Sequence, residues 1–248
     1  IHSLVKPHAY YIWFGLVSEI NDSERKIITI EDPIEYQLKG INQIQVSEKT
    51  GLTFARGLRS ILRHDPDVLL VGEIRDQETA QIAVQASLTG HLVFSTLHTN
   101  DAPGAITRMV DMGVESYLVA SSLEAVIAQR LVRVLCPHCK TEDTSERTLA
   151  LRKRLGLPDD RTVFRAVGCE QCRHTGFHGR RAVFEMMMLN TEIRDMVLHE
   201  HSAGEIRLAA SRAGMKSLSE DGWRLVLEGA TTVQEVLRVS KDEQFEWW

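Results

Sequence analysis

The sequence predicts an α/β protein built on a parallel sheet, and two short runs carry that prediction. Val68–Val71 is wholly apolar and bounded by polar residues, which is typical of a strand buried on both faces. Lys26–Ile30 is rich in β-branched residues and predicts a second strand. Both runs lead into carboxylates, and helical segments separate them along the chain. In such sheets ligands bind beyond the carboxyl ends of the strands.

Composition and charge narrow the class of protein. The 248 residues are 43% hydrophobic and 25% charged, which predicts one large globular domain or two smaller ones. The formal net charge of -5 leaves no basic excess, so nucleic acid is not expected as a partner. No apolar run approaches the ~20 residues that span a bilayer, and no signal peptide opens the chain. We therefore expect a cytoplasmic protein.

The first elements place an acidic run beyond a strand. Tyr10–Phe14 is apolar and aromatic and is compatible with a strand, whereas Lys26–Ile30 is the clearer one. Glu31, Asp32 and Glu35 follow it, and Pro33 stops any helix there. Carboxylates in that position face the ligand side of an α/β sheet. The alternative is an acidic surface turn.

A helix predicted over Thr53–Arg63 carries a row of arginines. Arg56, Arg59 and Arg63 recur at three- and four-residue spacing and so share one side, opposite the apolar residues. Guanidinium groups in such a row can bind phosphate oxygens through two hydrogen bonds each. The simpler alternative is a solvated basic face.

The stretch that organises the chain is the buried strand Val68–Val71 with the residues that follow it. Glu73 comes two residues after the strand, and a helix is predicted over Gln77–Leu88. A carboxylate at this end of a parallel strand is where nucleotide-binding folds hold Mg²⁺ or a reactive water. An ordinary strand-turn-helix with a solvated Glu73 is the alternative.

Two histidines flank the next predicted strand, Leu92–Phe94. His98 follows the strand and lies level with Glu73 if the two strands are parallel neighbours. His91 precedes the strand. A histidine in such a place is commonly structural, but beside acidic strand ends it can sense a γ-phosphate. We expect Glu35, Glu73 and both histidines to share one cleft. Two helices are predicted next, over Ala102–Met112 and Ser116–Val134.

All four cysteines occur in two Cys-x-x-Cys pairs, Cys136 with Cys139 and Cys169 with Cys172. Two such pairs supply four thiolates, the ligand set of structural Zn²⁺. A closed four-thiolate site has no open position, so the metal would be structural. His138 and His174 are not expected to be ligands. A redox dithiol is the alternative, but the βαβ setting of such motifs is missing.

The remainder is predicted to be helical from Thr191 onward, with capping boxes at Ser217-x-x-Glu220 and Thr232-x-x-Glu235. The chain is therefore expected to divide into an α/β core over 1–135, a tetracysteine subdomain over 136–175 and a C-terminal helical subdomain over 176–248.

Three of these segments together resemble the motifs of one family, the secretion and type IV pilus ATPases. Ile30–Tyr36 resembles the family's aspartate box, and Leu70–Asp76 its atypical Walker B motif. Thr89–His91 through Thr96–Asn100 resembles its histidine box, and the cysteines resemble the zinc subdomain of its secretion and pilus-assembly branches. The resemblance runs from about Pro7 to Val239. Phe54–Arg63 and Gln85–Thr89 are most similar to the type II secretion branch, with the pilus-assembly branch next.

The resemblance implies a RecA-like ATPase core in a homo-hexamer, peripheral to the inner membrane and associated with the secretion platform proteins. ATP, Mg²⁺ and Zn²⁺ are the implied cofactors. Glu35 would position or deprotonate the attacking water, and Glu73 would act through Mg²⁺. His91 and His98 would report the γ-phosphate state. The phosphate charge would be neutralised by three arginines, Arg59, Arg63 and Arg180.

The family's Walker A loop is missing from this sequence. No Gly-x-x-x-x-Gly-Lys-Ser/Thr occurs, and Ala9–Phe14 stands where the loop is expected. The N-terminal domains of the family are missing as well, so the chain resembles a fragment or a protein with an internal deletion. Three functions remain open: an impaired ATPase, a non-catalytic assembly subunit, and a zinc-dependent nucleic-acid binder. The net charge disfavours the third.

Overall fold

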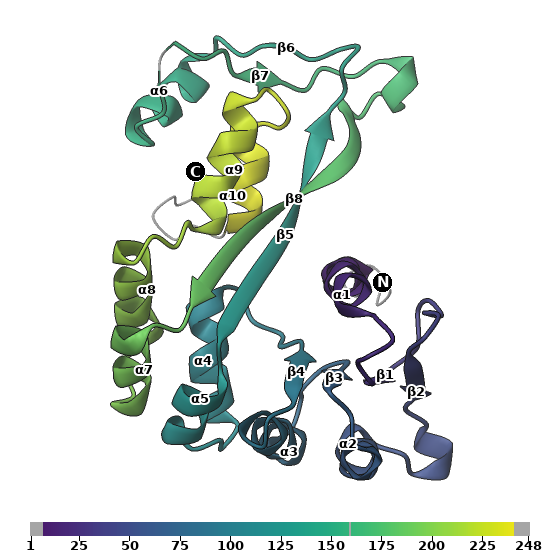
Figure 1. The fold of residues 1–248 in the computed structure, drawn as a ribbon. Coiled ribbons are helices and arrows are strands. Elements are labelled where there is room, and N and C mark those ends of the chain that lie inside the picture. The colour runs from purple at the N-terminus through teal and green to yellow at the C-terminus, as the bar shows by residue number, and fades with distance from the viewer. Residues whose placement is uncertain (1–6, 159, 241–248) are drawn as a thin grey trace. The chain divides into compact units, whose positions relative to one another are not determined.

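A four-stranded parallel sheet lies at the centre of the first part of the chain (Figure 1). The structure is a computed structural model that describes residues 7–158 and 160–240. The strand order is β2 (Asn42–Gln45), β1 (Ile27–Glu31), β3 (Val68–Val71) and β4 (Leu92–Ser95). Each neighbouring pair is parallel, so the carboxyl ends of all four strands lie at one edge of the sheet. The predicted fold class is confirmed.

Helices cover both faces of this sheet, and its two inner strands are therefore completely buried. Helix α1 (Pro7–Ile20) packs on one face, where Val17 meets Ile27, Val68 and Leu70. Helices α2 (Phe54–Ile61) and α3 (Gln77–Leu88) lie on the opposite face (Figure 1). The carboxylates of Asp76 and Asp101 cap the starts of α3 and of α4 (Ala102–Asp111).

The described residues fall into two compact units. The first comprises the chain up to Val126 together with Met187–Ala213. Besides the sheet and its helices it contains α4 and three further helices, α5 (Ser116–Ser122), α7 (Thr191–Leu198) and α8 (Ala203–Arg212), with short 3-10 turns at Glu48–Thr50 and Leu62–His64. Helix α5 packs on α7, and α4 packs on α8. The ion pair between Arg207 and Asp101, at 2.8 Å, ties α8 to the start of α4.

The second unit comprises Ile127–Met186 and the residues from Gly214 on. Its main feature is a two-stranded ribbon of β5 (Ala125–Leu135) and β8 (Phe177–Met188), of which residues 125–126 and 187–188 are assigned to the first unit. A small antiparallel pair, β6 (Thr141–Glu142) with β7 (Phe164–Arg165), lies next to helix α6 (Glu146–Arg154) in sequence. The remaining elements are a 3-10 turn and two helices that pack on each other, η3 (Glu170–Cys172), α9 (Leu218–Leu227) and α10 (Val233–Ser240).

The local structure differs from the sequence analysis at three places. The helix predicted over Ser116–Val134 ends at Ser122, and strand β5 follows. Strand β8 was not predicted, although its Val183, Glu185 and Met187 are buried while the residues between them are exposed. The apolar segment Tyr10–Phe14 is part of helix α1. The three-part division of the chain stays a prediction. Helices α7 and α8 belong to the first unit, and α9 and α10 belong to the second.

A buried carboxylate joins β5 to α10 within the second unit. The side chain of Glu235 is 3% exposed and binds the Arg133 guanidinium at 2.6 Å and that of Arg238 at 3.0 Å. It also accepts from the backbone N–H of Arg133 at 3.1 Å. Burial by itself would raise the pKa of Glu235, but the hydrogen bonds from Arg133 and Arg238 outweigh it and lower the pKa to about 2.

This carboxylate makes the stability of the second unit dependent on pH. Because the folded pKa lies below the unfolded value, the stabilisation is complete above about pH 4.5 and is lost as the pH falls toward 2. We expect the free energy of unfolding to fall by about 3 kcal/mol over that window. Urea unfolding at several pH values measures it. Glu235→Gln should flatten the curve, and Glu142→Gln, at an exposed position on β6, should leave it unchanged. An equally steep curve in Glu235→Gln would contradict the assignment.

Candidate functional site

A buried glutamate lies at the carboxyl edge of the parallel sheet. Glu73 comes two residues after β3, and its side chain is only 6% exposed. Its Oε2 atom lies 2.6 Å from Nε of Arg75 and 3.0 Å from Nε2 of His98. The sequence prediction that Glu73 and His98 meet is therefore confirmed, whereas Arg75 was not considered as a partner. The sequence could have indicated this pair, because Arg75 is only two residues from Glu73 and carries the opposite charge.

The loops after β3 and β4 hold these side chains in place through three hydrogen bonds. The hydroxyl of Ser95 donates to the carbonyl of Val71 at 2.9 Å, and the hydroxyl of Thr96 to that of Gly72 at 2.8 Å. The N–H of Ile74 donates to the carbonyl of Thr96 at 3.0 Å. The two loops are thus joined immediately around Glu73.

Gly72 permits a close approach of the neighbouring strand. A Cβ atom at this position would lie 3.1 Å from the carbonyl oxygen of Ile30 and 3.2 Å from the ring of Phe54. Both contacts are tighter than ordinary van der Waals distances, and Ile30 is completely buried. The glycine before Glu73 therefore has a packing reason, separate from any ligand.

The acidic segment after β1 has one buried and one exposed glutamate. Glu31 is the last residue of β1 and is 3% exposed. Its Oε1 atom accepts from the Thr29 hydroxyl at 2.6 Å and from the Gln43 amide at 3.0 Å. Gln43 also donates to the carbonyl of Tyr36 and accepts from the N–H of Leu38, so it anchors the loop that carries Glu35. Glu35 itself is exposed on that loop.

The expected single cleft does not include His91. His91 precedes β4, so it lies at the amino edge of the sheet, whereas His98 follows the strand at the carboxyl edge. The Nδ1 atom of His91 lies 2.9 Å from the carbonyl of Ala86, at the end of α3. The two histidines therefore lie at opposite edges of the sheet. The expectation of one shared cleft was wrong for His91 because the motif from Thr89 to Asn100 spans the whole of β4 and therefore has residues at both ends of the strand.

The three candidate phosphate-binding arginines have different surroundings. Arg59 forms an ion pair with Glu78 of α3 at 2.5 Å. Arg63 is exposed and makes no hydrogen bond or ion pair within the described part of the chain. Arg180 is exposed on β8, in the second unit. Of the three, only Arg63 is both in the first unit and without a partner there.

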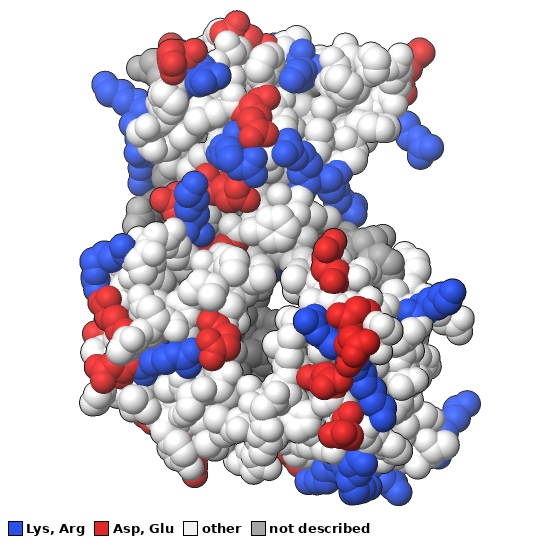
Figure 2. Space-filling model, in the orientation of Figure 1, with Lys and Arg blue, Asp and Glu red and all other residues white. Residues whose placement is uncertain are grey.

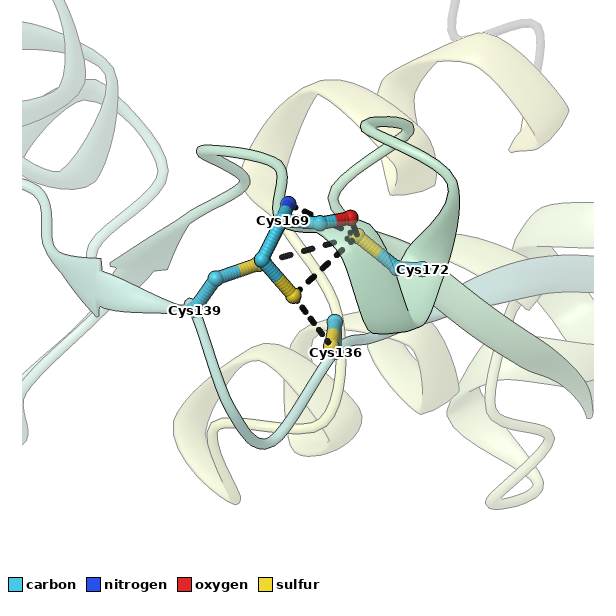
Figure 3. Close-up of side chains that lie close together, drawn as sticks. All are labelled: Cys136, Cys139, Cys169 and Cys172. Carbon is cyan, nitrogen blue, oxygen red and sulfur yellow. Dashed lines mark hydrogen bonds between the residues drawn. The ribbon is translucent and has the colours of Figure 1, made fainter.

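The four cysteines form a site with the geometry of a tetrahedral zinc centre (Figure 3). Their Sγ atoms lie within 4.8 Å of one another, with 3.9 Å between Cys136 and Cys169. The separations from Cys172 to Cys139 and to Cys169 are both 3.8 Å. A tetrahedron with Zn–S bonds of about 2.3 Å has sulfur atoms about 3.8 Å apart. The donor set and the spacing therefore both fit Zn²⁺.

Backbone N–H groups surround these sulfur atoms. The N–H of Gly168 points to Sγ of Cys139 at 3.3 Å, and those of Cys169 and Gly176 point to Sγ of Cys172 at 3.2 Å. Burial raises the pKa of the Cys172 thiol, but the N–H groups of Cys169 and Gly176 outweigh it and lower the pKa to about 6. Burial raises the pKa of Cys139 to about 11. A thiolate is the form that binds zinc, so these N–H groups favour the ligand state at Cys172.

The cysteine site joins the ends of the β5–β8 ribbon. Cys136 follows β5 directly, and its N–H donates to the carbonyl of Gly176, the residue before β8, at 2.9 Å. Gly168 and Gly176 have positive φ angles of 112° and 75°. A Cβ at Gly168 would lie 2.7 Å from the carbonyl oxygen of His174, so the loop geometry requires glycine there. A metal bound here would hold both strands at one end of the ribbon.

The charged side chains of one face and the lengths of the helices bear on two further expectations from the sequence. Figure 2 shows basic and acidic side chains interspersed over the visible face, without a continuous basic band. The formal net charge of the full sequence is -5. Among residues 7–158 and 160–240, every helix is too short or too polar to cross a bilayer.

The ion pair of Glu73 with Arg75 is expected to contribute to the stability of the first unit. The carboxylate is buried and the guanidinium is about half exposed, so removing Arg75 leaves a buried charge with one partner fewer. We expect Arg75→Ala to cost about 1–2 kcal/mol in unfolding free energy. The cost should disappear in Glu73→Gln, which a double-mutant cycle in urea measures. Arg108→Ala, on the exposed side of α4, is the control. Additive effects of the two substitutions would contradict the pairing.

A buried glutamate beyond a central parallel strand, paired with a histidine that follows the next strand, defines an α/β protein with polar groups at the ligand-binding edge of its sheet. The comparison with known sequences is more specific. The profile of the family described as Type II/IV secretion system protein matches residues 14–238, nearly the whole chain. The chain belongs to this family.

Individual relatives and structures agree with that membership. The chain is 53% identical over 232 residues to the type II secretion system protein E of Aeromonas hydrophila. It is 49% identical over 234 residues to the type II secretion system ATPase E of Vibrio cholerae, and 49% identical over 229 residues to the type IV pilus assembly ATPase PilB of Thermus thermophilus. A crystal structure of the pilus retraction motor PilT with bound ADP superposes with a TM-score of 0.69 at 30% identity.

The chain spans only part of these proteins. The alignments with the Aeromonas and Vibrio proteins cover 93% of this chain but 46% of each relative. For the Thermus protein the values are 90% and 25%, and for the PilT structure 94% and 57%. The relatives therefore place this chain in an ATPase family, and the activity of a whole relative does not follow from the part that is shared.

Proposed function

We propose that this chain is the core of a type II secretion ATPase, which couples ATP hydrolysis to pseudopilus assembly and protein export. The observation that carries the proposal is Glu73, a buried carboxylate held between Arg75 and His98 at the carboxyl edge of the sheet. Named ATPases among the relatives, with identities near 50%, support it. In this proposal the chain acts as a homo-hexamer in the cytoplasm, docked on inner-membrane platform proteins.

Most of the site residues predicted from the sequence have distinct roles in this proposal. Mg²⁺, when bound with ATP, would neutralise phosphate charge, and Glu73 would act through it. Glu35 orients the attacking water, and the buried hydrogen bonds of Glu31 and Gln43 hold its loop. His98, whose Nε2 atom lies 3.0 Å from Oε2 of Glu73, would report the γ-phosphate state. Arg63, Arg59 and Arg180 neutralise phosphate charge within or between subunits. His91 has no role in this proposal because it lies at the amino edge of the sheet.

A second function, a non-catalytic assembly subunit, is favoured by one specific observation. The sequence contains no Walker A loop, and the segment where the family carries it is one continuous helix, α1. Without the loop, neither the backbone N–H cradle nor the phosphate-binding lysine is available. A pilus-assembly ATPase is the nearest alternative within the family, since PilB of Thermus thermophilus is as similar as several secretion proteins.

Interference with a working secretion system tests both functions. The chain is expressed at increasing levels in Aeromonas hydrophila, and secretion of an exported enzyme is measured. Incorporation into the hexamer should reduce secretion in a dose-dependent way. A Glu73→Gln variant should interfere equally if the chain is a non-catalytic subunit, and more strongly if the chain contributes hydrolysis. Unchanged secretion at expression levels above those of the host ATPase would refute assembly, and interference with pilus assembly alone would favour the pilus branch.

A further inference from the structure

The loop that carries His98 is anchored at both of its ends. At its start, the carbonyl of Thr96 accepts from the N–H of Ile74 at 3.0 Å, and the hydroxyl of Thr96 donates to the carbonyl of Gly72 at 2.8 Å. At its far end, Asp101 caps helix α4. The side chain of His98 lies between these anchors and is 63% exposed, so little packing holds the ring itself. The position of the ring therefore depends on how firmly the two ends of the loop are held.

The carboxylate of Asp101 makes two different contacts at the far end of this loop. Its Oδ1 atom accepts from the N–H of Gly104 at 2.7 Å, which is the hydrogen bond of an N-cap residue. Its Oδ2 atom lies 2.8 Å from Nη2 of Arg207 on helix α8. The hydroxyl of Thr99 donates to the backbone carbonyl of Asp101 at 3.1 Å. The loop therefore ends on a residue that is bound to α4 through one oxygen and to α8 through the other.

The ion pair with Arg207 is separate from the cap of α4. A good N-cap side chain satisfies the N–H groups at a helix start without a cation beside it. Arg207 adds a directional bond, because a guanidinium is planar and holds its donors in fixed positions. Both side chains are only partly buried, so the pair contributes little to stability, and its effect is expected on the position of the loop. Helix α8 packs on α4 and α7 and so provides a fixed base for this bond.

We propose that Arg207 is a positioning residue for His98. By holding the carboxylate of Asp101, it fixes the end of the loop and keeps Nε2 of His98 within hydrogen-bonding distance of Oε2 of Glu73. The consequence for hydrolysis rests on the proposed function, because the contact between His98 and Glu73 acquires a catalytic meaning only with a bound nucleotide. The effect on His98 itself does not rest on that function, and it is measured on the chain without nucleotide.

Nitrogen NMR spectroscopy of a chain with isotopically labelled histidine tests the proposal. The chemical shift of the His98 Nε2 atom depends on its contact with Glu73, and a Glu73→Gln variant gives the reference signal for the altered contact. In Arg207→Ala, the signal should move from its place in the unaltered chain toward that reference. Asp101→Asn keeps a capping side chain but removes the charge that Arg207 binds, so it should produce the same change. The double variant of Arg207→Ala with Asp101→Asn should show no further change.

Two other substitutions on α8 separate positioning from a general effect on the helix. Arg207→Lys keeps the charge without the planar fork and should restore the His98 signal in part. Arg212→Ala is the matched control, because Arg212 ends the same helix and pairs with Glu192 of α7 at 2.9 Å. It should leave the His98 signal unchanged.

A His98 signal that stays in place in a folded Arg207→Ala, or that moves equally in Arg212→Ala, overturns the proposal. If Arg207→Ala does not fold, Asp101→Asn decides the same question, since it retains the cap of α4. A failure of this proposal and a failure of the proposed ATPase function are distinguishable, because the NMR measurement involves no nucleotide and no hydrolysis.

Discussion

Cys169→Ala is expected to abolish zinc binding and to unfold the end of the second unit. The unaltered chain should contain one Zn²⁺ per molecule, bound by Cys136, Cys139, Cys169 and Cys172, whose sulfur separations match a tetrahedral site. Structural zinc binding contributes about 10–16 kcal/mol in zinc-finger peptides, which have little other core. The second unit also has a core formed by the ribbon and the helices. We therefore expect the loss of zinc to reduce its free energy of unfolding without unfolding the whole unit.

The measurement is metal content together with thermal unfolding. Each 1 kcal/mol corresponds to about 2–4 °C for a chain of this size, so we expect the transition of the second unit to fall by about 10 °C or more. Chelation of the unaltered chain should produce the same shift. His138→Ala, at an exposed residue between Cys136 and Cys139, is the matched control and should keep both metal and stability. A chain purified without chelator that contains no zinc would refute this assignment.

The parts of the fold that the sequence predicted are those with a strong local pattern. Strand β3 and helix α3 begin and end at the predicted residues, because an apolar run between turn signals leaves little choice of state. The meeting of Glu73 with His98 also followed from the sequence, since parallel neighbours place their carboxyl ends together. The cysteine site followed from spacing alone.

The ribbon of β5 and β8 was missed because its stability comes from distant residues. The segment from Ala125 to Leu135 is apolar and contains good helix formers, so its local preference does not decide between helix and strand. Its partner, Phe177–Met188, lies beyond the whole cysteine region in sequence. The buried ion pair of Arg133 with Glu235 was missed for the same reason, because it joins residues that are 102 positions apart in the sequence.

Polar partners at the site could not be predicted in full for a related reason. The sequence places Glu31, Asp32 and Glu35 in one acidic run, but the strand includes Glu31 and buries it while Glu35 remains exposed. The predicted strand ended at Ile30 and the observed strand ends at Glu31, and this shift of one residue decides which carboxylate is buried. Arg59 was a candidate for binding phosphate, and in the structure its guanidinium pairs with Glu78 on the neighbouring helix.

The chain as it stands is expected to bind ATP weakly at best and to hydrolyse it at the background rate. Phosphoryl transfer in this class of protein depends on positioning and on neutralising the triphosphate charge. The missing Walker A loop would supply several N–H donors and one ammonium group. Charge-assisted hydrogen bonds contribute ~1.5–3 kcal/mol each, so losing even three weakens binding about thousandfold or more. Arg63 can contact phosphate, but it cannot replace a cradle that fixes the β- and γ-phosphates.

Restoring the loop tests this expectation directly. A Gly-x-x-x-x-Gly-Lys-Ser segment is inserted between Phe14 and Gly15 with its own flanking strand and helix residues, because Pro7–Ile20 is a single helix and supplies no strand. Mg²⁺-dependent phosphate release should rise above background in the graft. The same graft with Glu73→Gln should show no such rise. A graft with alanine in place of the loop lysine is the matched control and should remain inactive. Robust Mg²⁺-dependent hydrolysis by the chain without any graft would contradict the argument, because another segment would then have to supply the phosphate cradle.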